Sequence, residues 1–80
     1  MRLDKYLKIS RIIKRRTVAK DACDGGRVKI NGKTAKAALE VKIGDVIELS
    51  LGARQIKVEV LLVSEHTAKG DAPLMYRLLE

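Results

Sequence analysis

Apolar residues near the start of the chain recur at the spacing of an α-helix. Leu3, Tyr6 and Leu7 stand at positions i, i+3 and i+4, which places their side chains on one face of a helix. A second apolar set, at residues 9, 12 and 13, does not continue that face, so we expect a turn near Ser10–Lys14. Asp4 precedes Lys8 by four residues, an order that favours an ion pair on the helix surface.

A second helix is predicted from about Arg15 to Asp24. Its apolar stripe comprises Val18, Ala19, Ala22 and Cys23. Gly25 and Gly26 follow directly, and glycine often ends a helix because it accepts the left-handed conformation without a Cβ clash.

From residue 27 onwards the spacing of apolar residues changes to the period of two that is typical of strands. Val28 and Ile30 alternate with basic residues, and Asn31-Gly32 then gives a strong signal for a type I′ hairpin turn. Further strands are expected at residues 33–36, 46–49 and 56–60. A polar loop is expected at Ser64–Pro73, followed by an edge strand or a short helix at Met75–Leu79.

These elements together predict an α+β fold, in which two N-terminal helices pack on a small, twisted antiparallel β-sheet. A chain of 80 residues can build one thin core, so we expect residues 1–80 to form a single domain. No apolar run is long enough to cross a membrane, and the charged N-terminus lacks the apolar region of a signal peptide. We therefore expect a cytoplasmic protein.

Basic residues are concentrated in the first half of the chain. The net charge is +7, and residues 1–36 carry 12 basic and three acidic side chains, against five and seven in residues 37–80. Such an uneven field attracts nucleic acid, which also releases counterions when its phosphates are neutralised. A basic face kept for solubility and an anionic membrane surface are the alternatives. The stripe of Leu3, Tyr6 and Leu7 is short for a membrane-surface helix, which favours nucleic acid.

Aromatic residues are scarce, since the chain has two tyrosines and neither Phe nor Trp. Proteins that stack unpaired bases on a sheet need several exposed rings. We therefore expect this chain to recognise mainly the sugar–phosphate backbone and the shape of RNA.

Three ordered signatures resemble the RNA-binding S4 domain. They are RLDKYL at residues 2–7, Arg16-x-x-Ala19 at the start of the second helix, and GRVKING at residues 26–32 with Val41-x-x-Gly44-Asp45 downstream. The resemblance covers about residues 1–50, which we expect to form the S4 core, with residues 51–80 extending the sheet. It also supports the two-helix (αL-type) motif of the predicted fold.

Within this family the chain is similar to the small stand-alone members of bacterial ribosome-associated quality control. The resemblance implies a monomeric, non-enzymatic factor that binds large (50S) ribosomal subunits still carrying peptidyl-tRNA after a stalled ribosome has split. It implies contacts with peptidyl-site tRNA and large-subunit rRNA, and cooperation with the factor RqcH during alanine addition to the stalled chain. No small-molecule substrate is implied.

Two other roles compete with this one. The heat-shock-type S4 factors also bind free large subunits, although they are longer at the C-terminus than this chain. S4 domains also target RNA-modifying enzymes, but a chain ending at Glu80 leaves no room for a catalytic domain of its own.

Charge and resemblance together predict the residues that contact RNA. Arg16 ranks first, because it matches the recurrent arginine of the family and a guanidinium can hold phosphate through two parallel hydrogen bonds. The alternative for Arg16 is a surface ion pair with Asp21 or Asp24. The remaining candidates are Arg2, Lys5, Arg11, Lys14, Arg15, Lys20, Lys29 and Lys33, with Gly26, Asn31 and Gly32 shaping the turns that present them.

Two positions at the helix starts carry expectations of their own. Members of the family often have Ser or Thr before the arginine of the second helix, where it caps the helix, but this chain has Arg15. A phosphate could bind the uncapped amides there, beside Arg15 and Arg16. Asp4 is expected to act structurally, either as a charge at a helix N-terminus or as a group that orients a neighbouring arginine.

Catalytic, metal and cofactor sites are not predicted. Ser64, Glu65 and His66 are sequence neighbours, whereas a catalytic triad is built by geometry across a fold. One histidine and one cysteine cannot form a zinc site, and the chain has no P-loop. Cys23 is expected to be a small buried apolar residue in a reduced protein.

Overall fold

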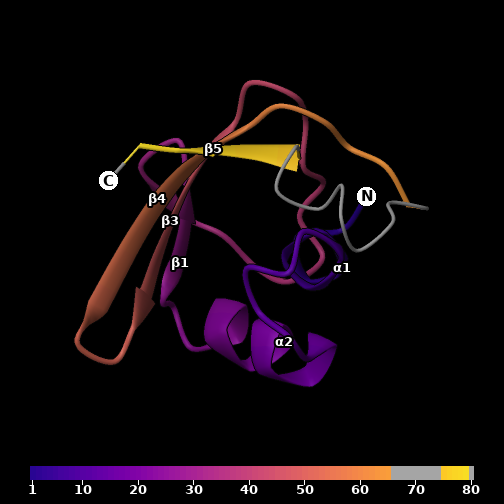
Figure 1. Ribbon diagram of the computed structural model, residues 1–80. Coiled ribbons are helices and arrows are strands. Elements are labelled where there is room, and N and C mark those ends of the chain that lie inside the picture. The colour runs from indigo at the N-terminus through magenta and orange to yellow at the C-terminus, as the bar shows by residue number, and fades with distance from the viewer. Residues whose placement is uncertain (66–74, 80) are drawn as a thin grey trace.

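The computed structural model describes residues 1–65 and 75–79, and shows two helices followed by five strands in one sheet (Figure 1). This arrangement confirms the predicted α+β class. The elements are α1 (Leu3–Ile9), α2 (Arg16–Asp24), β1 (Val28–Ile30), β2 (Lys33–Thr34), β3 (Val46–Leu51), β4 (Arg54–Val60) and β5 (Tyr76–Leu78).

Both helices end at a residue with a left-handed backbone. After α2, Gly26 has φ 77°, while its N–H donates to Cys23 O and the next N–H, of Arg27, donates to Ala22 O. These two bonds form a Schellman motif, as expected for a glycine at this position. After α1 the corresponding residue is Arg11, with φ 63°, and its N–H donates to Lys8 O. The first helix therefore ends as predicted, but with an arginine in a conformation that glycine adopts more easily.

The strands are antiparallel throughout and lie in the order β2-β1-β3-β4-β5. Asn31 and Gly32 both have positive φ, at 53° and 85°, which confirms the predicted type I′ turn between β1 and β2. The return strand β2 is shorter than expected. Residues 76–78 pair with β4, so the last segment is an edge strand rather than a helix. The predicted polar loop lies mostly at residues 66–74, outside the described residues.

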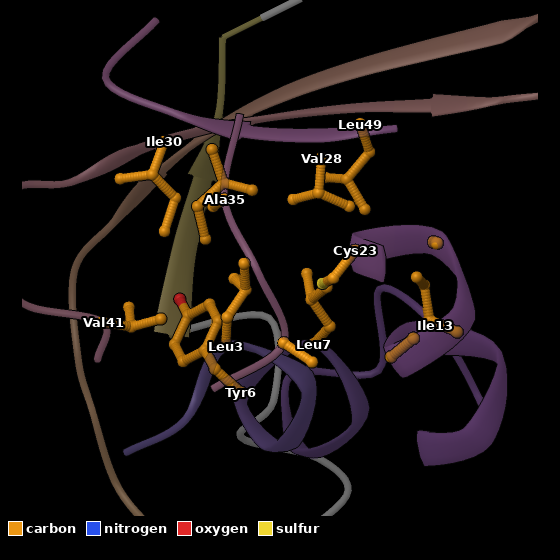
Figure 2. Packing of buried hydrophobic residues seen from close by; sticks show 14 of the residues in the cluster. Leu3, Tyr6, Leu7, Ile13, Cys23, Val28, Ile30, Ala35, Val41 and Leu49 are labelled. Atoms are coloured by element: carbon orange, nitrogen blue, oxygen red, sulfur yellow. The ribbon is translucent and has the colours of Figure 1, made fainter. Parts of the chain in front are cut away.

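The core lies between the helices and one face of the sheet (Figure 2). Leu3, Tyr6 and Leu7 are fully buried and point toward Val28 and other strand residues. The Tyr6 hydroxyl donates a hydrogen bond to the Met75 carbonyl at 2.7 Å, which joins α1 to the segment leading into β5. The helical face predicted from the i, i+3, i+4 spacing therefore packs on the sheet and also contacts the segment before β5.

Two predictions about the helices were wrong. Val18 is 46% exposed, so the buried stripe of α2 consists of Ala19, Ala22 and Cys23. Asp4 is buried, and its carboxylate pairs with Arg2 and Arg16 rather than with Lys8 on the surface. Among the described residues, no helix is long and apolar enough to cross a membrane.

Candidate nucleic-acid interface

The carboxylate of Asp4 lies between two arginines, one directly before α1 and the other at the start of α2. Arg2, at the start of α1, donates from Nε to Oδ1 at 3.2 Å and from Nη2 to Oδ2 at 3.3 Å. Arg16, the first residue of α2, donates from Nε to Oδ2 at 3.5 Å. The backbone N–H of Lys5 also donates to Oδ1 at 2.8 Å, which further fixes the position of the carboxylate. We call Arg2, Asp4 and Arg16 the Asp4 cluster.

Burial divides the Asp4 cluster into an inner anion and an outer pair of cations. The Asp4 side chain is 2% exposed, whereas those of Arg2 and Arg16 are each 47% exposed. Asp4 engages Nε and Nη2 of Arg2 and Nε of Arg16, which leaves Nη1 of Arg2 and both terminal nitrogens of Arg16 with donors for another acceptor. The cluster carries one net positive charge and presents two guanidiniums, the group best suited to binding phosphate through paired hydrogen bonds.

The Asp4 cluster resolves two expectations from the sequence. Asp4 does orient neighbouring arginines, as one of its two expected roles required. The acid next to Arg16 is Asp4 rather than Asp21 or Asp24, because the start of α2 packs against α1. Asp24 instead lies 4.0 Å from Lys20, one turn earlier on the same helix face.

Arg2 is also fixed through its backbone. It forms a β-bridge with Glu40, and the following N–H groups of Leu3 and Asp4 donate to Leu39 O and Ala37 O. The first amides of α1 are thus satisfied by the segment between β2 and β3. Arg2 is therefore an ordered group rather than part of a frayed terminus.

The N-terminus of α2 is built differently. Arg15 occupies the N-cap with an extended backbone, and no side chain caps the helix, as the sequence predicted. Arg15 and Arg16 are both exposed beside these amides. Arg11 and Lys14, in the turn that leads to α2, are exposed as well. This turn and the start of α2 therefore hold four exposed cations in six residues, close in sequence to the Asp4 cluster.

The other candidate residues lie in different settings. Lys5 forms an ion pair with Glu65, and Lys20 pairs with Asp24. Lys29 lies between the buried Val28 and Ile30 on β1, so it points to the sheet face away from the helices. Lys33 is exposed on the edge strand β2. The structure therefore places Lys29 on a different face from the basic residues of the helices.

Asn31 does more than shape its turn. Its side-chain oxygen accepts a hydrogen bond from the Val46 N–H at 3.0 Å, and its amide nitrogen donates to Asp45 Oδ1 at 3.2 Å. The other carboxylate oxygen of Asp45 accepts from the Lys42 N–H at 2.9 Å. Asn31 and Asp45 thereby join the first hairpin to the turn before β3.

Sequence reasoning missed a second surface feature that involves Arg11. A hollow of about 500 Å³ is lined by Arg11, Ile12, Arg54, Gln55, Ile56, Tyr76 and Leu78. These residues come from three segments that are distant in sequence. Arg54 and Tyr76 lie outside the family signatures, so no sequence signal pointed to them.

Within residues 1–65 and 75–79, His, Cys, Asp and Glu do not gather into a group of three or more that could hold a metal ion. Cys23 is buried, as predicted, and its pKa is raised from 9.0 to about 11 by burial and by the charges of Asp4 and Asp24. The thiol is therefore protonated at neutral pH and unsuited to nucleophilic chemistry. His66 lies outside the described residues.

Comparison with known proteins agrees with the geometry. The family model described as "S4 domain" matches residues 1–47, which include both helices and the first hairpin. The chain is 51% identical over 79 residues to the "RQC P-site tRNA stabilizing factor" of Streptococcus pneumoniae, covering 99% of this chain and 90% of that protein. It is 48% identical over 80 residues to the Bacillus subtilis protein of the same name, covering 100% and 93% of the two chains.

A solved structure is similar over nearly the whole chain. The trimeric structure of Vibrio cholerae Heat Shock Protein 15 superposes with a TM-score of 0.89 at 33% sequence identity, covering 98% of this chain and 80% of that chain. The likeness extends beyond residues 1–47, so the added strands are shared as well.

Proposed function

Because the chain belongs to the S4 domain family, we propose that it is a non-enzymatic RNA-binding factor of ribosome-associated quality control. In this role, of the RqcP (YabO) type, it binds rRNA and peptidyl-site tRNA on large (50S) subunits of stalled, split ribosomes. It supports alanine addition by RqcH and acts as a cytoplasmic monomer. The names of its 51% and 48% identical relatives support the quality-control role.

The Asp4 cluster is the observation that carries the RNA-binding part of this proposal. Two half-exposed guanidiniums, one before α1 and one at the start of α2, are fixed by one buried carboxylate, so their free nitrogens are oriented before a ligand arrives. Fixing a long side chain in advance lowers the entropy lost on binding. A phosphate bound there would accept charge-assisted hydrogen bonds from Arg2 and Arg16.

The start of α2 adds a second phosphate contact to the proposed interface. Its uncapped amides carry the positive end of the helix dipole, and Arg15 lies beside them. Lys14 extends the charge along the preceding turn. A sugar–phosphate backbone passing from the Asp4 cluster along this turn would meet cations at each step, which fits recognition by shape rather than by base sequence.

Co-sedimentation tests this proposal. Purified large subunits carrying peptidyl-tRNA are mixed with the protein across a salt series, and we expect binding to weaken steeply as salt rises. Arg16→Ala should weaken binding by about 1–3 kcal/mol, because a charge-assisted contact is lost. Arg77→Ala is the charge-matched control. Arg77 pairs with Glu59, and both lie on the sheet face opposite the core, because Val58 and Val60 on either side of Glu59 face the core. Equal binding by the Arg16→Ala and wild-type proteins would contradict the proposal.

The Vibrio cholerae likeness favours one second candidate, a heat-shock-type factor that binds free large subunits through the same RNA surface. The two roles differ in their effect on the stalled chain. Deleting the gene should abolish alanine tails on stalled chains under the first proposal. Intact tails, with free large subunits still bound by the protein, would favour the second.

A further inference from the structure

The hollow beside Arg11 is built from both layers of the fold. Arg11 and Ile12 come from the turn after α1, Arg54, Gln55 and Ile56 from β4, and Tyr76 and Leu78 from β5. We call it the Arg11–Arg54 groove. Its volume of about 500 Å³ lies in the range of sites that hold small ligands.

Strand register shows which face of the sheet forms this groove. Val58 pairs with Leu78 and Val60 pairs with Tyr76, and cross-strand partners share a face. Val58 and Val60 are fully buried against the helices, so Tyr76 and Leu78 lie on the same face. Arg54 and Ile56 also lie on this face, because side chains alternate along β4. The groove is thus the part of the helix-facing sheet surface that the helices leave uncovered.

The lining offers two kinds of contact. Arg11 and Arg54 supply two guanidiniums, and neither forms an ion pair within residues 1–65 and 75–79. Ile12, Ile56 and Leu78 supply apolar surface, and Tyr76 adds a half-buried ring. Among residues 1–65 and 75–79 the lining includes no carboxylate, so a ligand would meet cations beside apolar and aromatic surface.

The backbone at Arg11 gives a second, independent observation. Arg11 holds the left-handed position after α1 that Gly26 holds after α2. A left-handed conformation is less favourable for a residue with a Cβ than for glycine. Glycine would therefore serve the turn better, and the cost is offset if the arginine side chain has a role. Strained residues of this kind cluster at ligand-binding sites.

We propose that the Arg11–Arg54 groove binds one unpaired nucleotide of the RNA on which the protein acts. Arg11 and Arg54 hold its phosphate, while the base lies against Tyr76 and the neighbouring apolar side chains. A single ring suffices for one base, although the chain lacks rings for a stacking sheet. This inference rests on the proposed function and adds to it a site for single-stranded RNA, separate from the Asp4 cluster.

An acidic peptide could also satisfy the two arginines. Carboxylate side chains, however, gain little binding free energy from the apolar and aromatic side chains between the two arginines. A nucleotide uses both parts of the lining, because its phosphate contacts the arginines and its base packs against the apolar and aromatic side chains. The lining therefore favours a nucleotide, and the peptide becomes an outcome of the test.

Fluorescence anisotropy distinguishes these ligands. The probes are a labelled single-stranded RNA hexamer, a blunt RNA duplex and a labelled hexaglutamate peptide. The Arg11→Gly/Arg54→Ala variant should bind the hexamer on the order of tenfold more weakly, because charge-assisted contacts are lost, and the duplex within about twofold of wild type. For the hexamer, the slope of log affinity against log salt concentration should become shallower by about the amount expected for one lost phosphate contact. Lys57→Ala, on the opposite sheet face, is the control and should leave hexamer binding unchanged.

Two further measurements separate a loss of binding from a loss of folding and test the role of the ring. Arg11→Gly replaces a strained residue with one that fits the turn, so its thermal midpoint should equal or exceed that of wild type. Tyr76→Leu keeps an apolar wall but removes the ring, and should weaken hexamer binding severalfold.

Three results would overturn the inference. The first is unchanged hexamer binding by the Arg11→Gly/Arg54→Ala variant, and the second is an equal loss for hexamer and duplex. The third is hexaglutamate binding as tight as RNA with the same dependence on both arginines, which would assign the groove to an acidic peptide. None of these results bears on large-subunit binding by the Arg16→Ala protein. The groove inference and the proposed function are therefore tested independently.

Discussion

Asp4 on α1 accepts a hydrogen bond from the Nε of Arg16 on α2, and does so from a buried position. The contact ties the first residue of α2 to the helix packed against it. The same carboxylate also binds Arg2, so one buried anion sets the direction of two exposed cations. An acidic residue is thereby built into the surface that is proposed to bind an anion.

Asp4→Asn tests whether orientation matters more than net charge. The substitution raises the net charge by one, which by simple attraction would strengthen RNA binding. We expect weaker binding instead, because the asparagine amide cannot hold two guanidiniums. The free energy of unfolding should fall by about 1–3 kcal/mol, as a buried acceptor for charged donors is lost. Large-subunit binding and chemical denaturation measure the two effects.

Asp21→Asn is the matched control for this prediction. Asp21 is exposed on α2, and the change adds the same charge without touching the Asp4 cluster. It should leave stability within about 0.5 kcal/mol of wild type and bind RNA slightly more tightly. If Asp4→Asn also bound more tightly, Asp4 would have no orienting role.

Arg16→Lys separates charge from geometry at the same position. Lysine keeps the positive charge but lacks the planar set of donors that can bind Asp4 and a phosphate together. We expect it to recover less than half of the binding free energy lost in Arg16→Ala. Full recovery, measured by the same large-subunit assay, would show that a point charge is sufficient.

Tyr6→Phe probes the link between α1 and the segment before β5. The Met75 carbonyl also accepts hydrogen bonds from the Leu61 and Leu62 N–H groups, so it remains satisfied when the hydroxyl is removed. The loss of stability should therefore be modest, about 0.5–1.5 kcal/mol in urea denaturation. A loss above about 3 kcal/mol would mean that the hydroxyl contributes more than this one bond.

The raised pKa of the Cys23 thiol predicts how the free energy of unfolding depends on alkaline pH. Burial and the charges of Asp4 and Asp24 raise the pKa of its thiol in the folded chain to about 11, against 9.0 ordinarily. Between these values the unfolded chain loses a proton that the folded chain keeps, so stability falls as pH rises. The slope approaches about 1.4 kcal/mol per pH unit.

Burial likewise raises the pKa of Tyr6 above its ordinary value of 10.0, and this adds a loss in the same direction at higher pH. Cys23→Ala should therefore flatten the stability profile mainly between pH 9 and 10. Urea denaturation across this range measures it, and an unchanged slope in the variant would contradict the assignment to Cys23.

Much of the fold could be predicted because its signals are local. The spacing of Leu3, Tyr6 and Leu7 defines a buried helix face, and Asn31-Gly32 defines a hairpin turn, without reference to distant residues. Val18 was misplaced because helical spacing gives the direction of a side chain but not the width of the surface that covers it. The form of residues 76–78 depended on pairing with β4, a contact between distant segments.

The candidate site was predictable in composition rather than in geometry. The charge distribution and the resemblance to the S4 domain together pointed to Arg2 and Arg16, but their common contact with Asp4 depends on the packing of α1 against α2. Lys29 was predicted as an RNA contact from the hairpin, but strand alternation directs it to the sheet face away from the helices. The Arg11–Arg54 groove could not be predicted, because tertiary structure alone brings its three segments together.

The most direct test of RNA binding by the helical cations is cryo-electron microscopy of large subunits purified on the tagged protein. We expect a tRNA in the peptidyl site, with Arg2 and Arg16 within hydrogen-bonding distance of RNA phosphates. Subunits in which the Asp4 cluster and the start of α2 face solvent or protein, with RNA contacting another surface, would contradict the account.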